Sequence, residues 1–156
     1  NTWNEVKRHI NKKIIGFTSG YFDIMHPGHI LMLDECKRYC DYLIIGVNDV
    51  VDWGDDTWIQ PDGRHKNEPI WTPTERLLMV RSNRNVDEAF LCLGEEKLYE
   101  YLEKNQERID VRILGEDHKD SPFTGDDLNI DIVFNSRNHD YSTTNIIKDI
   151  IDKGRI

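Results

Sequence analysis

The 156-residue sequence has no apolar run near the roughly 20 residues that a membrane-spanning helix needs. Its first residues also lack the apolar core and cleavage site of a secretory signal, so we expect a cytoplasmic protein without a membrane segment. Three cysteines without dense spacing exclude a disulfide framework and fit a reducing compartment. Basic residues are outnumbered: 20 Lys and Arg against 29 Asp and Glu give a net charge of -9, which disfavours nucleic acid as a partner.

The length is suited to one domain with a hydrophobic core, and no internal repeat or low-complexity segment is present. Trp3, Val6 and Ile10 are at helical spacing, so we expect residues 1–12 to form an N-terminal helical extension. Residues 13–156 then make up the main domain.

Within that domain, a β-rich run over 13–19 ends at Gly20, and Pro27-Gly28 opens a helix whose apolar stripe covers 30–40. A second strand over 41–48 completes a β-α-β unit, which requires two parallel strands. After a long loop over 49–71, Thr72-Pro73-Thr74-Glu75 predicts a capping box and a helix to about residue 84. The pattern continues with a strand over 86–93, a helix over 95–107, strands over 111–114 and 130–135, and a last helix from about 142 to 151.

This alternation predicts an α/β fold: a Rossmann-like, mostly parallel sheet of about five strands with helices on both faces. In such sheets, ligands bind at the carboxyl ends of the strands.

The run Gly20-Tyr21-Phe22-Asp23-Ile24-Met25-His26-Pro27-Gly28-His29 lies at the first such end. Free backbone N–H groups at a helix start attract phosphate, and two imidazoles on the first turn can donate hydrogen bonds to its oxygens. Such donors stabilise a pentacoordinate phosphoryl transition state. We interpret Asp23 as a structural brace of the turn. The alternatives are histidines that act only as caps, or a zinc site completed by Cys36 and Cys40. Those cysteines share the Leu33 stripe, which favours packing in the core.

The fixed positions Gly-x-Phe-Asp-x-x-His-x-Gly-His are the signature of the cytidylyltransferase-like nucleotidyltransferases, and residues 20–29 match each of them. A second element, Arg-Thr-Glu-Gly-Ile-Ser-Thr-Thr in small glycerol-3-phosphate cytidylyltransferases, is similar to residues 137–144, which keep the Arg and the Ser-Thr-Thr. There Asp140-Tyr141 replaces Gly-Ile, and Tyr-Ser-Thr-Thr looks more like the adenylyltransferase domains that activate heptose phosphate. The resemblance extends over residues 13–152.

The resemblance implies roles for individual residues. The residues implied in catalysis are His26, His29, Lys66, Arg84 and Arg137. Those implied in nucleotide binding are Gly20, Tyr21, Phe22, His26, Gly28, His29, Arg64, Asp117, Arg137, Ser142, Thr143 and Thr144. Lys66 is also implied in substrate binding, where Lys97 is the nearest candidate for a second lysine. Mg²⁺ is expected with the nucleotide triphosphate, without a metal site made by protein side chains.

The first function that the resemblance implies is transfer of CMP from CTP to a phosphorylated alcohol, glycerol 3-phosphate, with release of pyrophosphate by a homodimer. One alternative is an adenylyltransferase that uses ATP and a sugar phosphate such as heptose phosphate. Another is a nucleotide-binding module without catalysis. Aminoacyl-tRNA synthetases also use His-x-Gly-His, but this acidic chain lacks a Lys-Met-Ser-Lys-Ser loop and room for a tRNA-binding apparatus.

Overall fold

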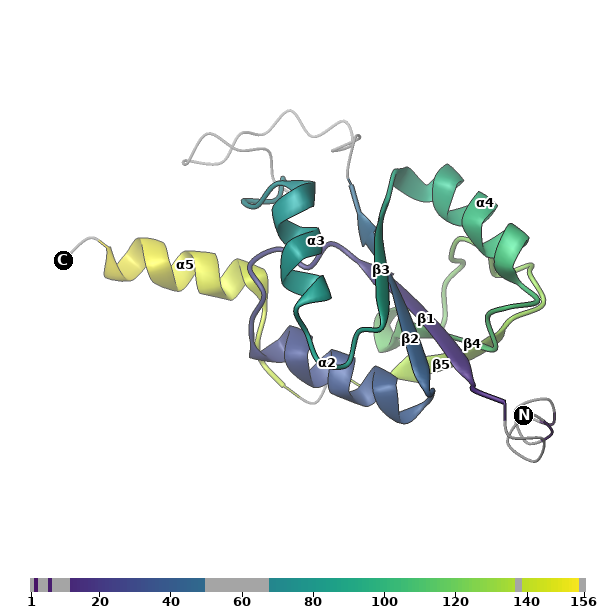
Figure 1. Cartoon of the computed structure of the whole chain (residues 1–156). Coiled ribbons are helices and arrows are strands. Elements are labelled where there is room, and N and C mark those ends of the chain that lie inside the picture. The colour runs from purple at the N-terminus through teal and green to yellow at the C-terminus, as the bar shows by residue number, and fades with distance from the viewer. Residues whose placement is uncertain (1, 3–5, 7–11, 50–67, 137–138, 155–156) are drawn as a thin grey trace.

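The computed structural model describes residues 2, 6, 12–49, 68–136 and 139–154. Its five-stranded sheet has the order β3-β2-β1-β4-β5, and all neighbouring strands pair in parallel (Figure 1). The strands are β1 (Ile15–Gly20), β2 (Tyr42–Asn48), β3 (Glu88–Cys92), β4 (Val111–Gly115) and β5 (Asp131–Asn135). The helices are α2 (Pro27–Arg38), α3 (Pro73–Arg81), α4 (Gly94–Asn105) and α5 (Thr143–Lys153), with a short 3₁₀ helix, η1 (Glu116–His118). The predicted α/β class is therefore confirmed.

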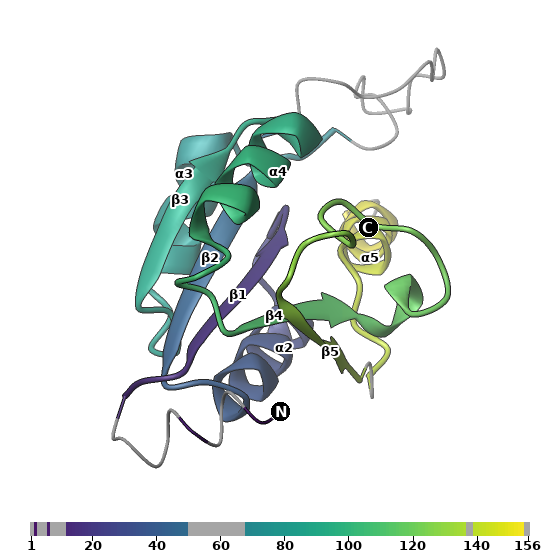
Figure 2. The same ribbon diagram turned by 90° about the vertical axis from the view of Figure 1, so that its right-hand side faces the viewer.

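Helices cover both faces of the sheet (Figure 2). Successive strand residues point to opposite sides, so each face presents apolar side chains on which a helix can pack. On β2, Leu43, Ile45 and Val47 pack with α2 and α3 in one core cluster. Ile44, between them, belongs to the second cluster, with Leu98 of α4. The three cysteines are free and buried, which confirms their predicted place in the core.

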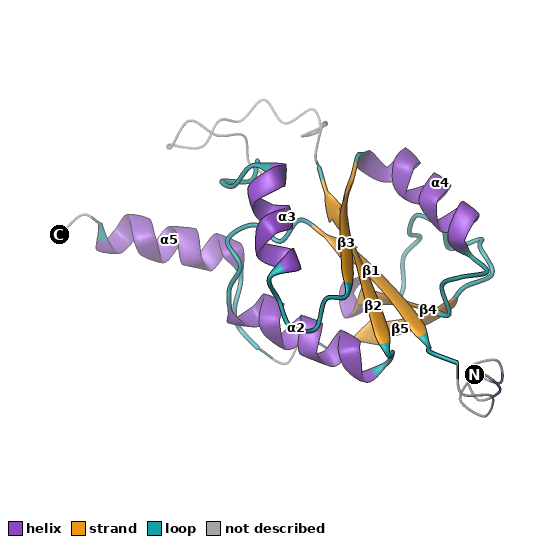
Figure 3. Ribbon diagram, in the orientation of Figure 1, coloured by secondary structure: helices purple, strands orange, loops and turns teal. Residues whose placement is uncertain are grey.

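The helix starts follow the sequence signals. Thr72 caps α3 through its hydroxyl, which accepts from the backbone N–H of Glu75 at 3.2 Å, and the Glu75 carboxylate accepts from the N–H of Thr72 at 3.0 Å. This is the capping box predicted from Thr72-Pro73-Thr74-Glu75. Helix α5 projects from the body of the molecule and buries none of its residues (Figure 3).

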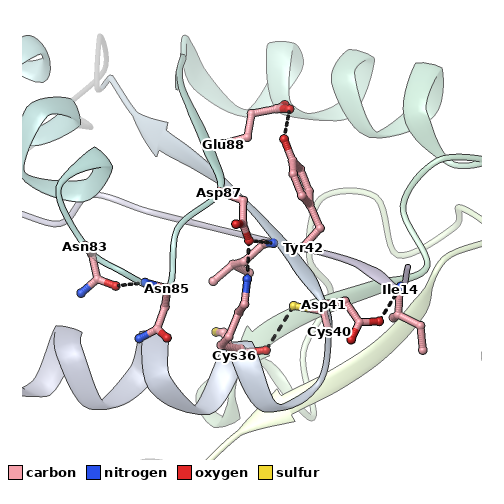
Figure 4. A network of polar contacts seen from close by, with 11 residues as sticks. Ile14, Cys36, Cys40, Asp41, Tyr42, Asn83, Asn85, Asp87 and Glu88 are labelled. Atoms are coloured by element: carbon pink, nitrogen blue, oxygen red, sulfur yellow. Dashed lines mark hydrogen bonds and ion pairs between the residues drawn. The ribbon is translucent and has the colours of Figure 1, made fainter. Parts of the chain in front are cut away.

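At the amino-terminal edge of the sheet, carboxylates hold the strand starts in register (Figure 4). Asp41 accepts from the N–H of Ile14 at 2.8 Å, and Asp87 accepts from the N–H of Leu43 at 2.9 Å. Asp87 also pairs with Lys37 of α2. The carboxylates at the amino-terminal edge thus make structural contacts. A ligand is expected at the opposite edge, where the strands have their carboxyl ends.

Two predicted segments lie mostly or wholly outside the described residues: the N-terminal extension over 1–12 and the central part of the long loop, 50–67. None of the helices in the described part of the chain is long and apolar enough to cross a membrane.

Candidate nucleotide site

A pocket of about 520 Å³ opens at the carboxyl edge of the sheet, between the ends of β4 and β5 and the first turns of α2 and α5. This volume is in the usual range for a small-molecule site. The pocket is lined by His26, Gly28, His29, Met32, Gly115, Glu116, Asp117, Asn135, Ser136, His139, Tyr141, Ser142 and Thr143. Segments far apart in the sequence therefore meet where parallel α/β sheets bind ligands.

His26 and His29 are held by backbone donors. Nδ1 of His26 accepts from the N–H of Gly28 at 3.0 Å, and Nδ1 of His29 accepts from the N–H of His26 at 3.2 Å. A neutral imidazole carries one N–H, so an accepting Nδ1 places that hydrogen on Nε2. Both histidines are thus fixed in the tautomer that can donate from Nε2 to an anion.

The structure corrects one detail of the predicted phosphate site. The N–H of Gly28 bonds to the His26 imidazole, and the N–H groups of His29 and Ile30 bond to the carbonyl of His26 at 2.9 and 3.2 Å. Since these donors are satisfied within α2, they are not the free backbone groups that the sequence predicted. The groups at this helix start that can still donate to a ligand are side chains, the candidate ones being the two imidazoles.

Burial, with smaller contributions from His26 and His139, lowers the pKa of His29 from its ordinary value of 6.5 to about 4. His29 is therefore neutral at physiological pH in the ligand-free pocket. A neutral imidazole still donates from Nε2, and it does so without a charge that would have to be desolvated.

Asp23 supports the histidine turn, as the sequence predicted. Its carboxylate accepts from the N–H of Ile70 at 2.8 Å and of Trp71 at 3.0 Å. Its backbone carbonyl accepts from the hydroxyl of Thr143 at 3.1 Å. The turn is thereby joined to the segment before α3 and to the first turn of α5. Phe22 and Ile24, on either side of Asp23, have positive φ angles of 55° and 47°, a strained backbone that these contacts hold in place.

The pocket brings together six of the predicted residues: His26, Gly28, His29, Asp117, Ser142 and Thr143. The Ser142 hydroxyl caps α5 by accepting from the N–H of Asn145 at 3.1 Å. At the same turn, the backbone N–H groups of Thr143 and Thr144 donate no hydrogen bond to any residue that the structure describes. Helix α5 thus offers the kind of free backbone donor that α2 lacks.

Four other predicted nucleotide residues that the structure describes do not line the pocket: Gly20, Tyr21, Phe22 and Thr144. Phe22 is buried in the core, with its ring centroid 5.6 Å from that of His29, so it packs behind the histidine. The Gly20 backbone approaches this same ring. Tyr21 is half exposed, and burial together with the nearby Glu95 carboxylate raises its pKa, which places it toward α4.

Arg84 and Lys97 do not have the positions that their expected roles require. Arg84 precedes β3 at the amino-terminal edge, opposite the pocket, where its exposed guanidinium lies 3.8 Å from Asp34. The local sequence resembles the family, but strand direction carries this arginine away from the site, so the catalytic expectation is corrected. Lys97 is exposed on α4 and pairs with Glu100 at 3.1 Å. Arg64, Lys66 and Arg137 lie outside the described residues.

Two residues of this region were missed from the sequence. His139 lies within the pocket, against Gly28. Arg76 is fully buried in α3 and donates to the carbonyls of Trp71, Tyr21 and Asn48 at 3.1, 2.9 and 2.6 Å. Its four-residue spacing from the buried Val80 is the signal that could have marked it as an inward-facing arginine.

A parallel α/β sheet with a donor-rich pocket at its carboxyl edge is the arrangement in which doubly wound α/β proteins bind their ligands. The sequence model of the family described as cytidylyltransferase-like matches residues 17–149. The chain belongs to this cytidylyltransferase-like family of nucleotidyltransferases.

Several relatives support this assignment. Bifunctional protein HldE of Campylobacter jejuni serotype O:2 is 34% identical over 149 residues, which cover 92% of this chain and 29% of that protein. The FAD synthase of Ferroglobus placidus is 34% identical over 118 residues, covering 75% of this chain and 68% of the synthase. The lipopolysaccharide core biosynthesis protein of Thermoplasma volcanium has a similar structure, with a TM-score of 0.52, 26% identity, and coverage of 83% of this chain and 99% of that one. This chain thus spans less than a third of the HldE relative and two thirds of the synthase.

Proposed function

We propose that this protein is an adenylyltransferase that transfers AMP from ATP to a sugar phosphate and releases pyrophosphate. The observation that carries the proposal is the pair of imidazoles fixed as Nε2–H donors at the carboxyl edge of the sheet. Adenylyl rather than cytidylyl transfer is supported by the relatives. FAD, the product in the name of one of them, contains AMP. The sequence Tyr141-Ser142-Thr143-Thr144 and the relatives named HldE point to heptose phosphate as the first acceptor to try.

In the proposed reaction, a phosphate oxygen of the acceptor attacks the α-phosphorus of ATP. A new P–O bond forms as the bond to the bridging oxygen of the β-phosphate breaks, and pyrophosphate leaves with that oxygen. The attacking oxygen is already ionised at neutral pH, so the step needs no general base. The protein has to position the reactants and stabilise the charge that builds on the transferred phosphoryl group.

His26 and His29 supply that stabilisation in this proposal, since their Nε2–H groups can donate to oxygens of the α-phosphate. The N–H groups of Thr143 and Thr144, which have no acceptor among the described residues, would hold the β- and γ-phosphates at the start of α5. Asp117, on η1 at the rim of the pocket, is proposed to contact the nucleoside. Arg64, Lys66 and Arg137 keep their implied role as cations for the phosphates.

We propose that the nucleotide would be bound together with Mg²⁺, which would supply positive charge to the triphosphate. The protein carboxylates that line the pocket are Glu116 and Asp117. In the described ranges, no three His, Cys, Asp or Glu side chains are grouped so that they could hold a metal ion. This donor set fits an ion bound mainly through the nucleotide.

CMP transfer from CTP to glycerol 3-phosphate is the second candidate, because residues 20–29 match the signature shared with cytidylyltransferases. A pyrophosphate-release assay with ATP and CTP, each against heptose phosphates, glycerol 3-phosphate and FMN, separates the candidates. We expect release only with ATP and a sugar phosphate. Release only with CTP and glycerol 3-phosphate would overturn the proposal, and binding without turnover would support a non-catalytic module.

We also propose that the chain forms a homodimer. Sedimentation of the purified chain would test it: a single species at twice the mass of 18.4 kDa is expected, and a monomer at micromolar concentration would contradict it.

A further inference from the structure

We propose that His139 is a third imidazole donor to the phosphates of the nucleotide, a role that rests on the nucleotide binding proposed above. It precedes the Ser-Thr-Thr element, at a position where the similar cytidylyltransferase segment has Glu. His139 would thus bind phosphate at a position where that segment has a carboxylate.

The orientation of the ring is set in the same way as in His26 and His29. Nδ1 of His139 accepts from the backbone N–H of Tyr141 at 3.1 Å. The hydrogen of the neutral ring therefore lies on Nε2. Nε2 of His139 donates to no residue in the part of the chain that the structure describes.

The ring lies directly against the start of α2. A Cβ added at Gly28 would be 2.7 Å from Cε1 of His139 and 2.8 Å from Cε1 of His26. Gly28 is thus the residue that lets the two imidazoles approach the same helix turn. Because Nε2 is bonded to Cε1, the free donor of His139 lies next to this turn too.

The segment that carries His139 is anchored at both ends. Before it, the backbone N–H and hydroxyl of Ser136 donate to the carboxylate of Glu35 on α2 at 3.0 and 2.6 Å. After it, Thr143 donates to the carbonyl of Asp23. These contacts tie Ser136 to α2 and Thr143 to the histidine turn, on either side of His139 in the sequence.

The chemistry of the pocket favours an anion as the partner of this donor. His26, His29 and His139 all line the pocket, each with Nδ1 occupied by a backbone N–H. Groups that share this geometry can converge on the oxygens of a polyphosphate, which have no hydrogens of their own to donate.

Two substitutions separate a donor from a structural cap. In His139→Asn, Oδ1 can take the place of Nδ1 and accept from Tyr141, while the distal donor is lost. In His139→Gln, the longer side chain can place an amide N–H near the position of Nε2. His118→Asn removes an exposed imidazole that does not line the pocket and serves as the matched control.

The measurement is titration calorimetry at pH 7.5 with two probes, ATP and inorganic tripolyphosphate, on the full chain. We expect His139→Asn to weaken the binding of both probes about tenfold, the effect of one hydrogen bond to a charged group. We expect His139→Gln to stay within about threefold of the unsubstituted chain, and His118→Asn to bind normally.

Other outcomes would overturn the proposal. A loss of affinity for ATP but not for tripolyphosphate would assign His139 to the base or the ribose. Equal losses in the Asn and Gln variants would show that His139 has only a structural role in its loop. Unchanged affinity in both variants would also refute it. If the unsubstituted chain binds neither probe, nucleotide binding and this proposal fail together. If the unsubstituted chain binds both probes but transfers to no acceptor, the transferase function is refuted. The affinities of the His139 variants then still decide whether His139 binds phosphate.

Discussion

The imidazole of His29 accepts a hydrogen bond from the backbone N–H of His26 at 3.2 Å, and the two ring centroids lie 3.8 Å apart. His26 in turn binds the N–H of Gly28 with its own Nδ1. Each histidine therefore caps the start of α2 with Nδ1 and carries the hydrogen of its neutral ring on Nε2. Capping and the proposed catalytic role, which were alternatives at the level of sequence, would use opposite sides of the same rings.

This arrangement predicts the effect of removing only the donors. In His26→Asn and His29→Asn, the new amide oxygen can accept in place of Nδ1, while Nε2–H is lost. We expect kcat for pyrophosphate release to fall about 10²-fold or more in each variant. The melting temperature serves as the control for folding and should change little. Near-normal kcat in both variants would refute the assignment of the rings as transition-state donors.

The low pKa of His29 predicts a pH effect on stability. The unfolded ring binds a proton below its ordinary pKa of 6.5, whereas the folded ring does so only near 4. Between these values the unfolded state binds more protons, so stability decreases as pH falls. Urea unfolding at pH 7.5 and 4.5 should show that His29→Asn, which lacks this ring, loses less stability than the unsubstituted chain. An equal loss in both proteins would contradict the shift.

Asp23→Asn tests the brace beneath the turn. The carboxylate accepts from Ile70 and Trp71 with its two oxygens, and an amide can offer only one of them. One N–H at this part-buried position loses its acceptor, so we expect the free energy of unfolding to fall by about 1 kcal/mol. Denaturant titration measures this change. A stability equal to that of the unsubstituted chain would show that the two contacts do not hold the turn.

Arg84→Ala tests the correction made by the fold. The guanidinium is exposed at the edge of the sheet opposite the pocket, and exposed ion pairs of this kind contribute little to stability. We expect kcat and KM to remain within about twofold of their original values, which steady-state kinetics with the best substrate pair will measure. A large fall in kcat would restore the catalytic role that the family resemblance implied.

Most of the fold could be predicted because local signals were strong. Thr72 and Glu75 marked the start of α3, and the strand-helix-strand run around α2 required parallel pairing. The position of the histidine turn could also be predicted, since Gly20 marks the end of the strand before it and Pro27 the start of the helix after it. What failed depended on tertiary geometry. Whether the N–H of Gly28 was free depended on the rotamer of His26, which no spacing reveals.

His139 could not be predicted as a site residue for a similar reason. Its place in the pocket depends on Ser136 binding Glu35, 101 residues earlier in the chain, and on the absence of a side chain at Gly28. Arg84 shows the reverse error, in which a local match suggested a site residue and the direction of β3 placed it elsewhere.

The most direct test of the central claim is single-turnover transfer from α-³²P-labelled ATP, with heptose phosphate as acceptor and with CTP in parallel. The account predicts that label passes from ATP to the sugar phosphate with release of unlabelled pyrophosphate, and that His29→Asn slows this step at saturating substrate. Transfer from labelled CTP alone, or no transfer of label from ATP to any phosphorylated acceptor, would contradict it.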